Sequence, residues 1–201
     1  MFDWLTSENH AVAILKKDHD KVKELFDRFE KEESKPARKK IIEQAINELK
    51  VHAVLEEEIF YPMIRKQVGE DLMNEADEEH HVAKLLIAEL ENLKNGDDHR
   101  DAKFTVLAEN VRHHIKEEQS EVMPKAKDMR LDFEKLGAEM LKRKARLQAD
   151  GVPPAAEDKL IANNPKSDSP AAASARRKAP RLVHNGHRSA PKRGRSATKK
   201  H

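Results

Sequence analysis

Apolar side chains recur every three or four residues through most of the first 150 positions, the spacing of an amphipathic helix. Ser34-Lys35-Pro36, Gly69 and Asn95-Gly96 interrupt this pattern, and proline and glycine are typical of helix boundaries. Pro62 falls inside the second predicted helix and should bend it or end it early. The pattern predicts five helices, over residues 7–33, 36–67, 70–94, 98 to about 124, and 129–149.

Long helices joined by short connections favour antiparallel neighbours. We therefore predict an all-α fold, an up-down-up-down four-helix bundle. The bundle should occupy residues 1–128, and a trailing helix over residues 129–150 should pack on it or extend it. Residues 151–201 are rich in Ala, Pro, Ser, Lys and Arg and poor in large apolar side chains, so a disordered basic tail is expected there.

The first two and the next two helices look like two copies of one helical hairpin. Aligning Asp18-His19 with Glu79-His80 superposes the apolar residues that follow each pair. In the second helix of each copy, His52 aligns with His114. The spacing agrees as well, because 33 residues separate the two histidines of the first copy and 34 separate those of the second.

Six polar side chains interrupt the apolar stripes of the four bundle helices, and all six respect the repeat. They are His19, His52, Glu56, His80, His114 and Glu118. On the second helix the stripe continues beyond them through Ile59 and Met63. At 1.5 Å per residue the four histidines lie roughly 25 Å from the turns that join their helices, so the six side chains should share one layer.

Left unpaired, each of these buried groups would cost several kcal/mol, and the whole layer would outweigh the roughly 5–15 kcal/mol by which a domain is stable. Core packing usually explains a lone histidine on an apolar stripe, but four histidines with two paired glutamates favour bound metal. Imidazole nitrogen with carboxylate oxygen suits iron, zinc or manganese, whereas an all-oxygen site would suit calcium or magnesium. Because a carboxylate can bridge two cations, this set can serve two metals.

Four short motifs, in this order, resemble the hemerythrin-like family, the HHE cation-binding domain. They are Asp18-His19, His52-x-x-x-Glu56 ahead of Ile59-Phe60-Tyr61-Pro62, Glu79-His80, and His114-x-x-x-Glu118 ahead of Pro124. The resemblance covers about residues 8–128. It implies a non-haem di-iron centre with the four histidines as nitrogen ligands and Glu56 and Glu118 as bridging carboxylates. The two iron ions would carry an oxo or hydroxo bridge when oxidised.

The same resemblance implies a protein that binds or senses dioxygen, nitric oxide or peroxide, in oxidative or nitrosative stress or in iron handling. The chain departs from the blood oxygen carriers of the family at two positions. Those carriers have a second histidine one turn before the third-helix ligand, where this chain has Ala76, and an aspartate five residues after the last histidine, where it has Gln119. These departures argue against reversible oxygen carriage. Asp77 or Tyr61 is a candidate for an additional ligand.

Other polar residues near these motifs fall off the stripes or at helix ends. His81 and His113, for example, are rotated by about 100° from the stripe. We predict that the following residues face solvent: His10, Glu57, Glu58, His81, His99, His113 and Glu117.

Composition limits which binding partners and which cellular compartment are expected. Residues 151–201 carry 12 Lys/Arg against 3 Asp/Glu, whereas the whole chain has a net charge of +2, so the predicted bundle is acidic and the tail basic. A solvated tail is favoured, and weak contact of residues 151–201 with nucleic acid or an anionic surface stays an open alternative. Cysteine is absent, which excludes disulfides and thiolate ligands. No apolar run approaches the roughly 20 residues of a membrane span and no secretion signal is visible, so we expect a cytoplasmic protein.

Two other functions stay open at this point. The same centre could belong to an enzyme that breaks down peroxide or reduces nitric oxide, but no further acid–base residue stands out on the stripes, so a binding or sensing protein is favoured. The chain could also be a metal-free helical interaction module with a nucleic-acid-binding tail. Iron in protein purified in air without chelators would argue against the module.

Overall fold

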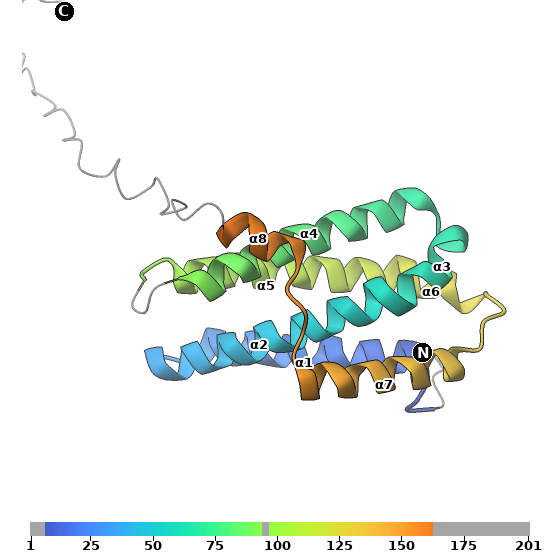
Figure 1. Cartoon of the computed structure of the whole chain (residues 1–201), viewed down its shortest axis with the longest axis horizontal. Coiled ribbons are helices and arrows are strands. Elements are labelled where there is room, and N and C mark those ends of the chain that lie inside the picture. The colour runs from blue at the N-terminus through green and yellow to red at the C-terminus, as the bar shows by residue number, and fades with distance from the viewer. Residues whose placement is uncertain (1–6, 94–96, 163–201) are drawn as a thin grey trace, which may run out of the picture. The chain divides into compact units, whose positions relative to one another are not determined.

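The structure is a computed structural model that describes residues 7–93 and 97–162. Every regular element in these two ranges is helical. They are α1 (Ala11–Lys31), α2 (Lys35–Leu55), the π-helical turn η1 (Glu56–Phe60), α3 (Tyr61–Val68), α4 (Glu70–Asn92), α5 (Arg100–Glu117), the π-helical turn η2 (Glu118–Val122), α6 (Met123–Lys127), α7 (Phe133–Asp150) and α8 (Ala156–Ala162). The all-α bundle predicted from the sequence is confirmed (Figure 1).

Two helical hairpins make up the bundle. α1 packs along α2 and α4 packs along α5, so the hairpins follow the internal repeat of the sequence. Pro36 lies in the first turn of α2, where its missing N–H leaves no bond unmade. Gly69 joins the hairpins with a φ of 112°, a conformation that favours glycine. None of the helices in the described ranges is both long enough and apolar enough to span a bilayer.

A π-helical turn interrupts the second helix of each hairpin. In η1 the N–H of Tyr61 donates to the carbonyl of Glu56, five residues earlier, and Pro62 follows immediately. Proline has no N–H, and in an α-helix its ring clashes with the carbonyl four residues before it, so a widened turn accommodates it. η2 repeats the arrangement from Glu118 to Pro124. The bend expected at Pro62 therefore takes the form of a π turn.

The extra residue of η1 shifts the apolar stripe of the second helix by about 100°. Ile64 is buried at 0% exposure, whereas Met63 is 47% exposed. The prediction that the stripe continues through Met63 is therefore wrong, and Ile59 is only partly buried. Phe60 and Tyr61 occupy buried positions next to the turn.

The buried apolar side chains form two clusters, and the predicted polar layer lies between them. On α1 the first cluster ends at Leu15, the second begins at Val22, and His19 lies between the two. The first cluster also holds Phe60 and α7 residues, and the second is centred on phenylalanines that include Phe104. A polar layer between two apolar clusters is shielded from bulk water on both sides.

The trailing helix α7 packs on the bundle, against α1 and α2. Gly137 permits close approach, because a Cβ there would lie 1.7 Å from the backbone oxygen of Asn9. The His10 side chain accepts a hydrogen bond from the Val12 N–H and stacks on Phe133, with ring centroids 5.0 Å apart. His10 is only 8% exposed, so the prediction that it faces solvent is wrong.

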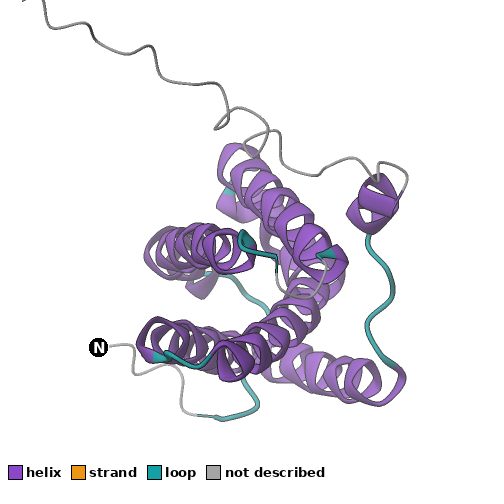
Figure 2. Ribbon diagram, turned by 90° about the vertical axis from the view of Figure 1, so that its left-hand side faces the viewer, coloured by secondary structure: helices purple, strands orange, loops and turns teal. Residues whose placement is uncertain are grey.

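Residues 152–155, here called the strap, run outside the bundle from α7 to α8, which lies on α4 (Figures 1 and 2). Disorder was predicted from residue 151, and for residues 151–162 this is wrong. Glu157 is 7% exposed and pairs with His81 over 2.7 Å, and the Ala155 N–H donates to Asp158 Oδ2 over 2.7 Å. The rest of the predicted basic tail, with its nucleic-acid contact, lies outside the described residues.

Candidate metal centre

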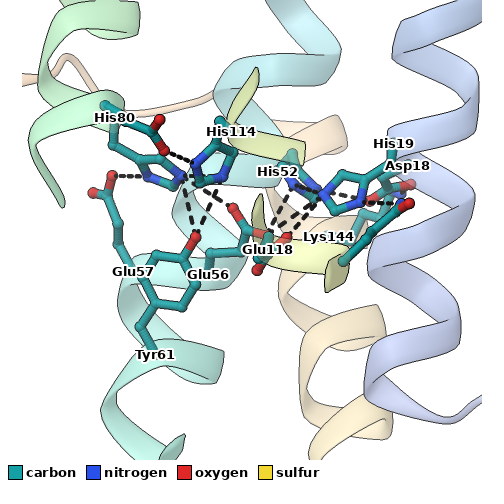
Figure 3. Close-up of polar contacts among 12 residues, drawn as sticks. Asp18, His19, His52, Glu56, Glu57, Tyr61, His80, His114, Glu118 and Lys144 are labelled. Carbon is teal, nitrogen blue, oxygen red and sulfur yellow. Dashed lines mark hydrogen bonds and ion pairs between the residues drawn. The ribbon is translucent and has the colours of Figure 1, made fainter. Parts of the chain in front are cut away.

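The six side chains singled out by the sequence meet in one layer of the bundle (Figure 3). α1, α2, α4 and α5 each contribute one histidine, in the order His19, His52, His80 and His114. The two π-helical turns contribute their first residues, Glu56 and Glu118. None of the six is more than 7% exposed.

His19 and His52 form one half of the centre. Their Nε2 atoms lie 3.0 Å apart. Glu118 Oε2 lies 3.2 Å from His19 Nε2, and Glu56 Oε1 lies 3.0 Å from His52 Nε2. Each residue offers one donor atom, and the four donor atoms lie within 4.8 Å of one another, so one cation could contact all of them.

His80 and His114 form the other half, and Glu56 belongs to both. The Nε2 atoms of the two histidines lie 3.2 Å apart. Glu56 turns its second oxygen, Oε2, toward this half, at 3.3 Å from His80 Nε2. One carboxylate therefore offers one oxygen to each half, the arrangement of a bridging ligand.

Two further carboxylates determine which nitrogens face the centre. His80 Nδ1 donates to Glu57 Oε1 over 2.8 Å, and His114 Nδ1 donates to Glu79 Oε2 over 2.7 Å. When both rings are neutral, their Nε2 lone pairs point at each other and repel unless a cation lies between them. Two nitrogen ligands about 2.1 Å from one ion and at right angles would be about 3 Å apart, so the spacing of the Nε2 atoms fits a shared metal.

The two glutamates of the layer supply independent support for a cation. Both oxygens of Glu56 and both oxygens of Glu118 are buried and accept no hydrogen bond. A buried carboxylate without hydrogen bonds is strongly destabilising unless a cation compensates it. The donor set of imidazole nitrogen and carboxylate oxygen fits iron, zinc or manganese.

In the absence of a metal, protons would supply the positive charge of the layer. Burial lowers the pKa of His52, but Glu56 and Asp18 outweigh burial and raise it to about 10. At His80 burial is likewise outweighed by Glu56 and Glu57, and the pKa rises to about 9. Burial would raise the pKa of Glu56, but the surrounding imidazoles hold it well below its ordinary range. The layer therefore favours bound cations.

Asp18 and a residue of α7 support the His19–His52 half. Asp18 is buried, its Oδ2 lies 3.8 Å from His52 Nδ1, and its other oxygen contacts Lys144 Nζ. The amide of Gln119 lies 3.1 Å from His19 Nδ1. A lysine of the trailing helix thus balances the charge of the carboxylate that faces His52.

The two candidates for an additional ligand have different surroundings. The hydroxyl of Tyr61 lies 3.4 Å from the Nε2 atoms of both His80 and His114. Burial and the nearby Glu118 and Glu56 raise the Tyr61 pKa well above its ordinary value, so the hydroxyl keeps its proton. Asp77 instead pairs with Arg65 over 2.6 Å and is 46% exposed, so it does not face the centre.

Three residues that contact or face the histidines were missed or misplaced by sequence reasoning. Glu57, predicted to face solvent, binds both His80 and Lys84, and that prediction is wrong. Asp18 and Glu79 were noted as parts of motifs but given no role. They occupy equivalent positions of the internal repeat, and each faces the histidine of the adjacent helix, so the repeat was the signal that could have found them.

A buried layer of four histidines and two carboxylates inside four antiparallel helices defines a cation-binding helical bundle. The sequence profile of the family described as Hemerythrin HHE cation binding domain matches residues 10–126. The chain therefore belongs to the hemerythrin HHE family.

A solved structure is similar as well. It is the crystal structure of a hemerythrin HHE cation binding domain-containing protein from Mycobacterium kansasii, with 20% sequence identity and a TM-score of 0.57. The match covers 71% of this chain and 94% of the other chain, and it shows the same fold. None of the curated proteins compared matches the chain.

Proposed function

We propose that the protein holds two iron ions, one in each half of the centre. His19, His52 and Glu118 would bind the first ion, His80 and His114 the second, and Glu56 would bridge them. The family resemblance implies that Glu118 bridges as well, but its Oε2 lies 3.2 Å from His19 Nε2 and it groups with the first half, so we assign it to the first ion. The observation that carries this proposal is the position of Glu56, whose two oxygens face two separate histidine pairs. Iron is favoured because the mixed nitrogen and carboxylate donors suit it and because the family resemblance implies it.

The ligand of this centre is proposed to be dioxygen, nitric oxide or peroxide, bound in a sensing or protective protein. Three protein donors on the His80 half, compared with four on the other half, favour this half for an external ligand. When bound, iron supplies the redox chemistry and the affinity for such molecules. The chain's own residues hold the ions, balance their charge and exclude bulk water.

The hydroxyl of Tyr61 supports a second candidate, an enzyme that breaks down peroxide. It is buried, keeps its proton and lies 3.4 Å from both histidines of the half with fewer donors, where it could donate a hydrogen bond to a bound ligand. A Tyr61→Phe variant keeps the ring and removes this donor. If the protein is such an enzyme, peroxide turnover falls in the Tyr61→Phe variant while its metal content is unchanged.

Metal analysis of the full-length protein, purified in air without chelators, tests the proposal. The expected result is two iron ions per chain with charge-transfer absorption in the near ultraviolet. A His80→Ala, His114→Ala double variant should lose the second ion and this absorption, because the four donors of the His19–His52 half stay in place. A His99→Ala variant is the control, since His99 is exposed and lies at the start of α5. Protein without iron would contradict the proposal and favour a metal-free interaction module. Two ions retained in the double variant would contradict the assignment of the second ion to His80 and His114.

A further inference from the structure

A cavity of about 340 Å³ lies beside the metal centre, between α2 and α4. We propose that it is a binding site for a neutral, largely apolar organic molecule with an oxygen-bearing head, the class to which organic hydroperoxides belong. The head would reach the centre, so the ligand class deepens, and rests on, the proposed function. The apolar body would occupy the remainder of the cavity.

The lining of the cavity places it against the centre. All four histidines of the layer contribute to its inner end. Beyond them the wall is apolar and belongs to the second core cluster, with Val22, Leu49, Ile87, Val111 and Ile115. An occupant would therefore meet imidazoles at one end and hydrocarbon along its length.

The size of the cavity favours an organic occupant over a diatomic molecule alone. An apolar cavity of about 150 Å³ already holds a benzene molecule, and ligand pockets in proteins start at about 300 Å³. Part of the volume, next to the four histidines, would be taken by the ions themselves. Dioxygen, nitric oxide and hydrogen peroxide each have two heavy atoms and would leave the apolar part of the cavity unfilled. Small side chains, Ala53 on α2 and Ala83 on α4, keep the space open between the two helices.

The charges around the cavity favour a neutral occupant. Lys84 pairs with Glu57 over 2.7 Å, and Lys50 pairs with Glu91 over 3.0 Å. Glu157 pairs with His81. The remaining acidic side chains of the lining have partners too, Arg143 for Glu58 and the Ala155 N–H for Asp158. Away from the centre, a charged group on the ligand would have to break one of these pairs, whereas a neutral body would not.

The strap covers part of the outer side of the cavity and adds to its depth. Gly151, with a φ of 87°, ends α7 and turns the chain toward α8. Pro153 and Pro154 follow, and their fixed φ limits the conformations of the strap. Val152 packs on the first core cluster at one end, and Glu157 holds α8 at the other. Residues 152–158 all line the cavity, so this face is covered by the chain's own C-terminal segment.

Binding of cumyl alcohol, the unreactive counterpart of cumene hydroperoxide, tests the inference. It is measured by calorimetry and ligand-observed nuclear magnetic resonance with the full-length, zinc-loaded protein, so that no turnover is needed. Ala83→Phe fills the cavity from α4 and Ala155→Trp fills it from the strap. We expect saturable binding by the unchanged protein and binding about tenfold weaker or more in both variants.

Ala102→Phe, at an exposed position of α5, is the matched control and should bind like the unchanged protein. If circular dichroism shows that Ala83→Phe does not fold, Ala155→Trp decides. Absence of saturable binding, or equal affinity in the filled variants, overturns the inference. The metal content of the same samples separates the two proposals. Two bound ions without probe binding overturn only the cavity ligand, whereas probe binding by protein that takes up no metal overturns the proposed function.

Discussion

The orientations of His80 and His114 each depend on a carboxylate from another helix or turn. Glu57 accepts from His80 Nδ1 and Glu79 accepts from His114 Nδ1, which leaves the Nε2 atoms to face the centre. Such partners fix the tautomer and the ring orientation of a ligand, and they raise its basicity. The affinity of the centre for metal should therefore depend on residues that do not bind the metal.

Replacing Glu57 by Gln tests this dependence. The variant removes the charge that accepts the His80 proton, so metal affinity should fall about 10- to 100-fold. Glu58→Gln is the matched control, because Glu58 is adjacent, exposed and paired with Arg143. Affinity is measured by titration against a competing chelator. Equal affinities for the two variants would show that Glu57 does not support the ligand.

Replacing Glu56 by Gln tests its place between the two halves. Because Glu56 offers one oxygen to each histidine pair, Glu56→Gln should weaken the binding of both ions. Glu118→Gln should weaken mainly the binding of the ion in the His19–His52 half. Metal per chain is measured after dialysis. Retention of both ions by Glu56→Gln would contradict a bridging role.

At this scale the sequence predicted the residues that converge but not those that support them. Histidine on an apolar stripe is conspicuous because the pattern shows which way it points. Asp18, Glu57 and Glu79 flank the stripe, and their partners depend on how neighbouring helices are rotated against each other. Periodicity carries no information on that rotation.

At the scale of the elements, the π-helical turns determine the positions of Glu56 and Glu118 in the metal centre. Each turn begins at the glutamate and is followed by a proline, in η1 by Pro62 and in η2 by Pro124. Pro62 signalled an irregularity, yet a period of 3.6 residues assumes a regular helix throughout. One additional residue per turn was enough to move Met63 out of the core and Ile64 into it.

Alanine substitutions on α3 test this shift of register. Ile64→Ala should destabilise the protein by about 2–5 kcal/mol, because it removes buried methyl groups. Met63→Ala should change stability by no more than about 0.5 kcal/mol, because its side chain is half exposed. Chemical denaturation of the metal-loaded variants provides the measurement. A larger loss in Met63→Ala would mean that the helix keeps the regular stripe.

For the whole molecule, the polar layer divides the core into two clusters, so folding and cation binding are coupled. His52 and His80 have pKa values raised from 6.5 to about 10 and about 9 when protons alone supply the charge. Because their pKa values are raised, the protonated histidines stabilise the folded protein fully below pH 6.5. This stabilisation is lost as the pH rises through 9 to 10. The pKa of Glu56 is lowered well below its ordinary 4.5, so the ionised carboxylate stabilises the folded protein above pH 4.5. This contribution is lost as the pH falls below 4.5.

Removal of metal should therefore change how stability depends on pH. In chelated protein we expect the Tm to fall as the pH rises from 6.5 toward 10. Metal-loaded protein should have a higher Tm and a flatter profile, because the ions replace the protons. Thermal unfolding followed by circular dichroism compares the two forms. Identical profiles would contradict a cation layer inside the core.

The global arrangement was largely predictable, because helix stripes, short turns and the internal repeat all indicate the same bundle. The C-terminal segment was not. Residues 156–162 contain few large apolar side chains, and α8 is held on α4 by the pair between Glu157 and His81, which lie 76 residues apart in the sequence. No local pattern reports such a contact.

Anomalous diffraction at the iron edge, from crystals of the iron-loaded protein, tests the two-ion centre most directly. Two peaks are predicted, one between His19 and His52 and one between His80 and His114, with a Glu56 oxygen next to each. A single peak, or peaks away from this layer, would contradict the account.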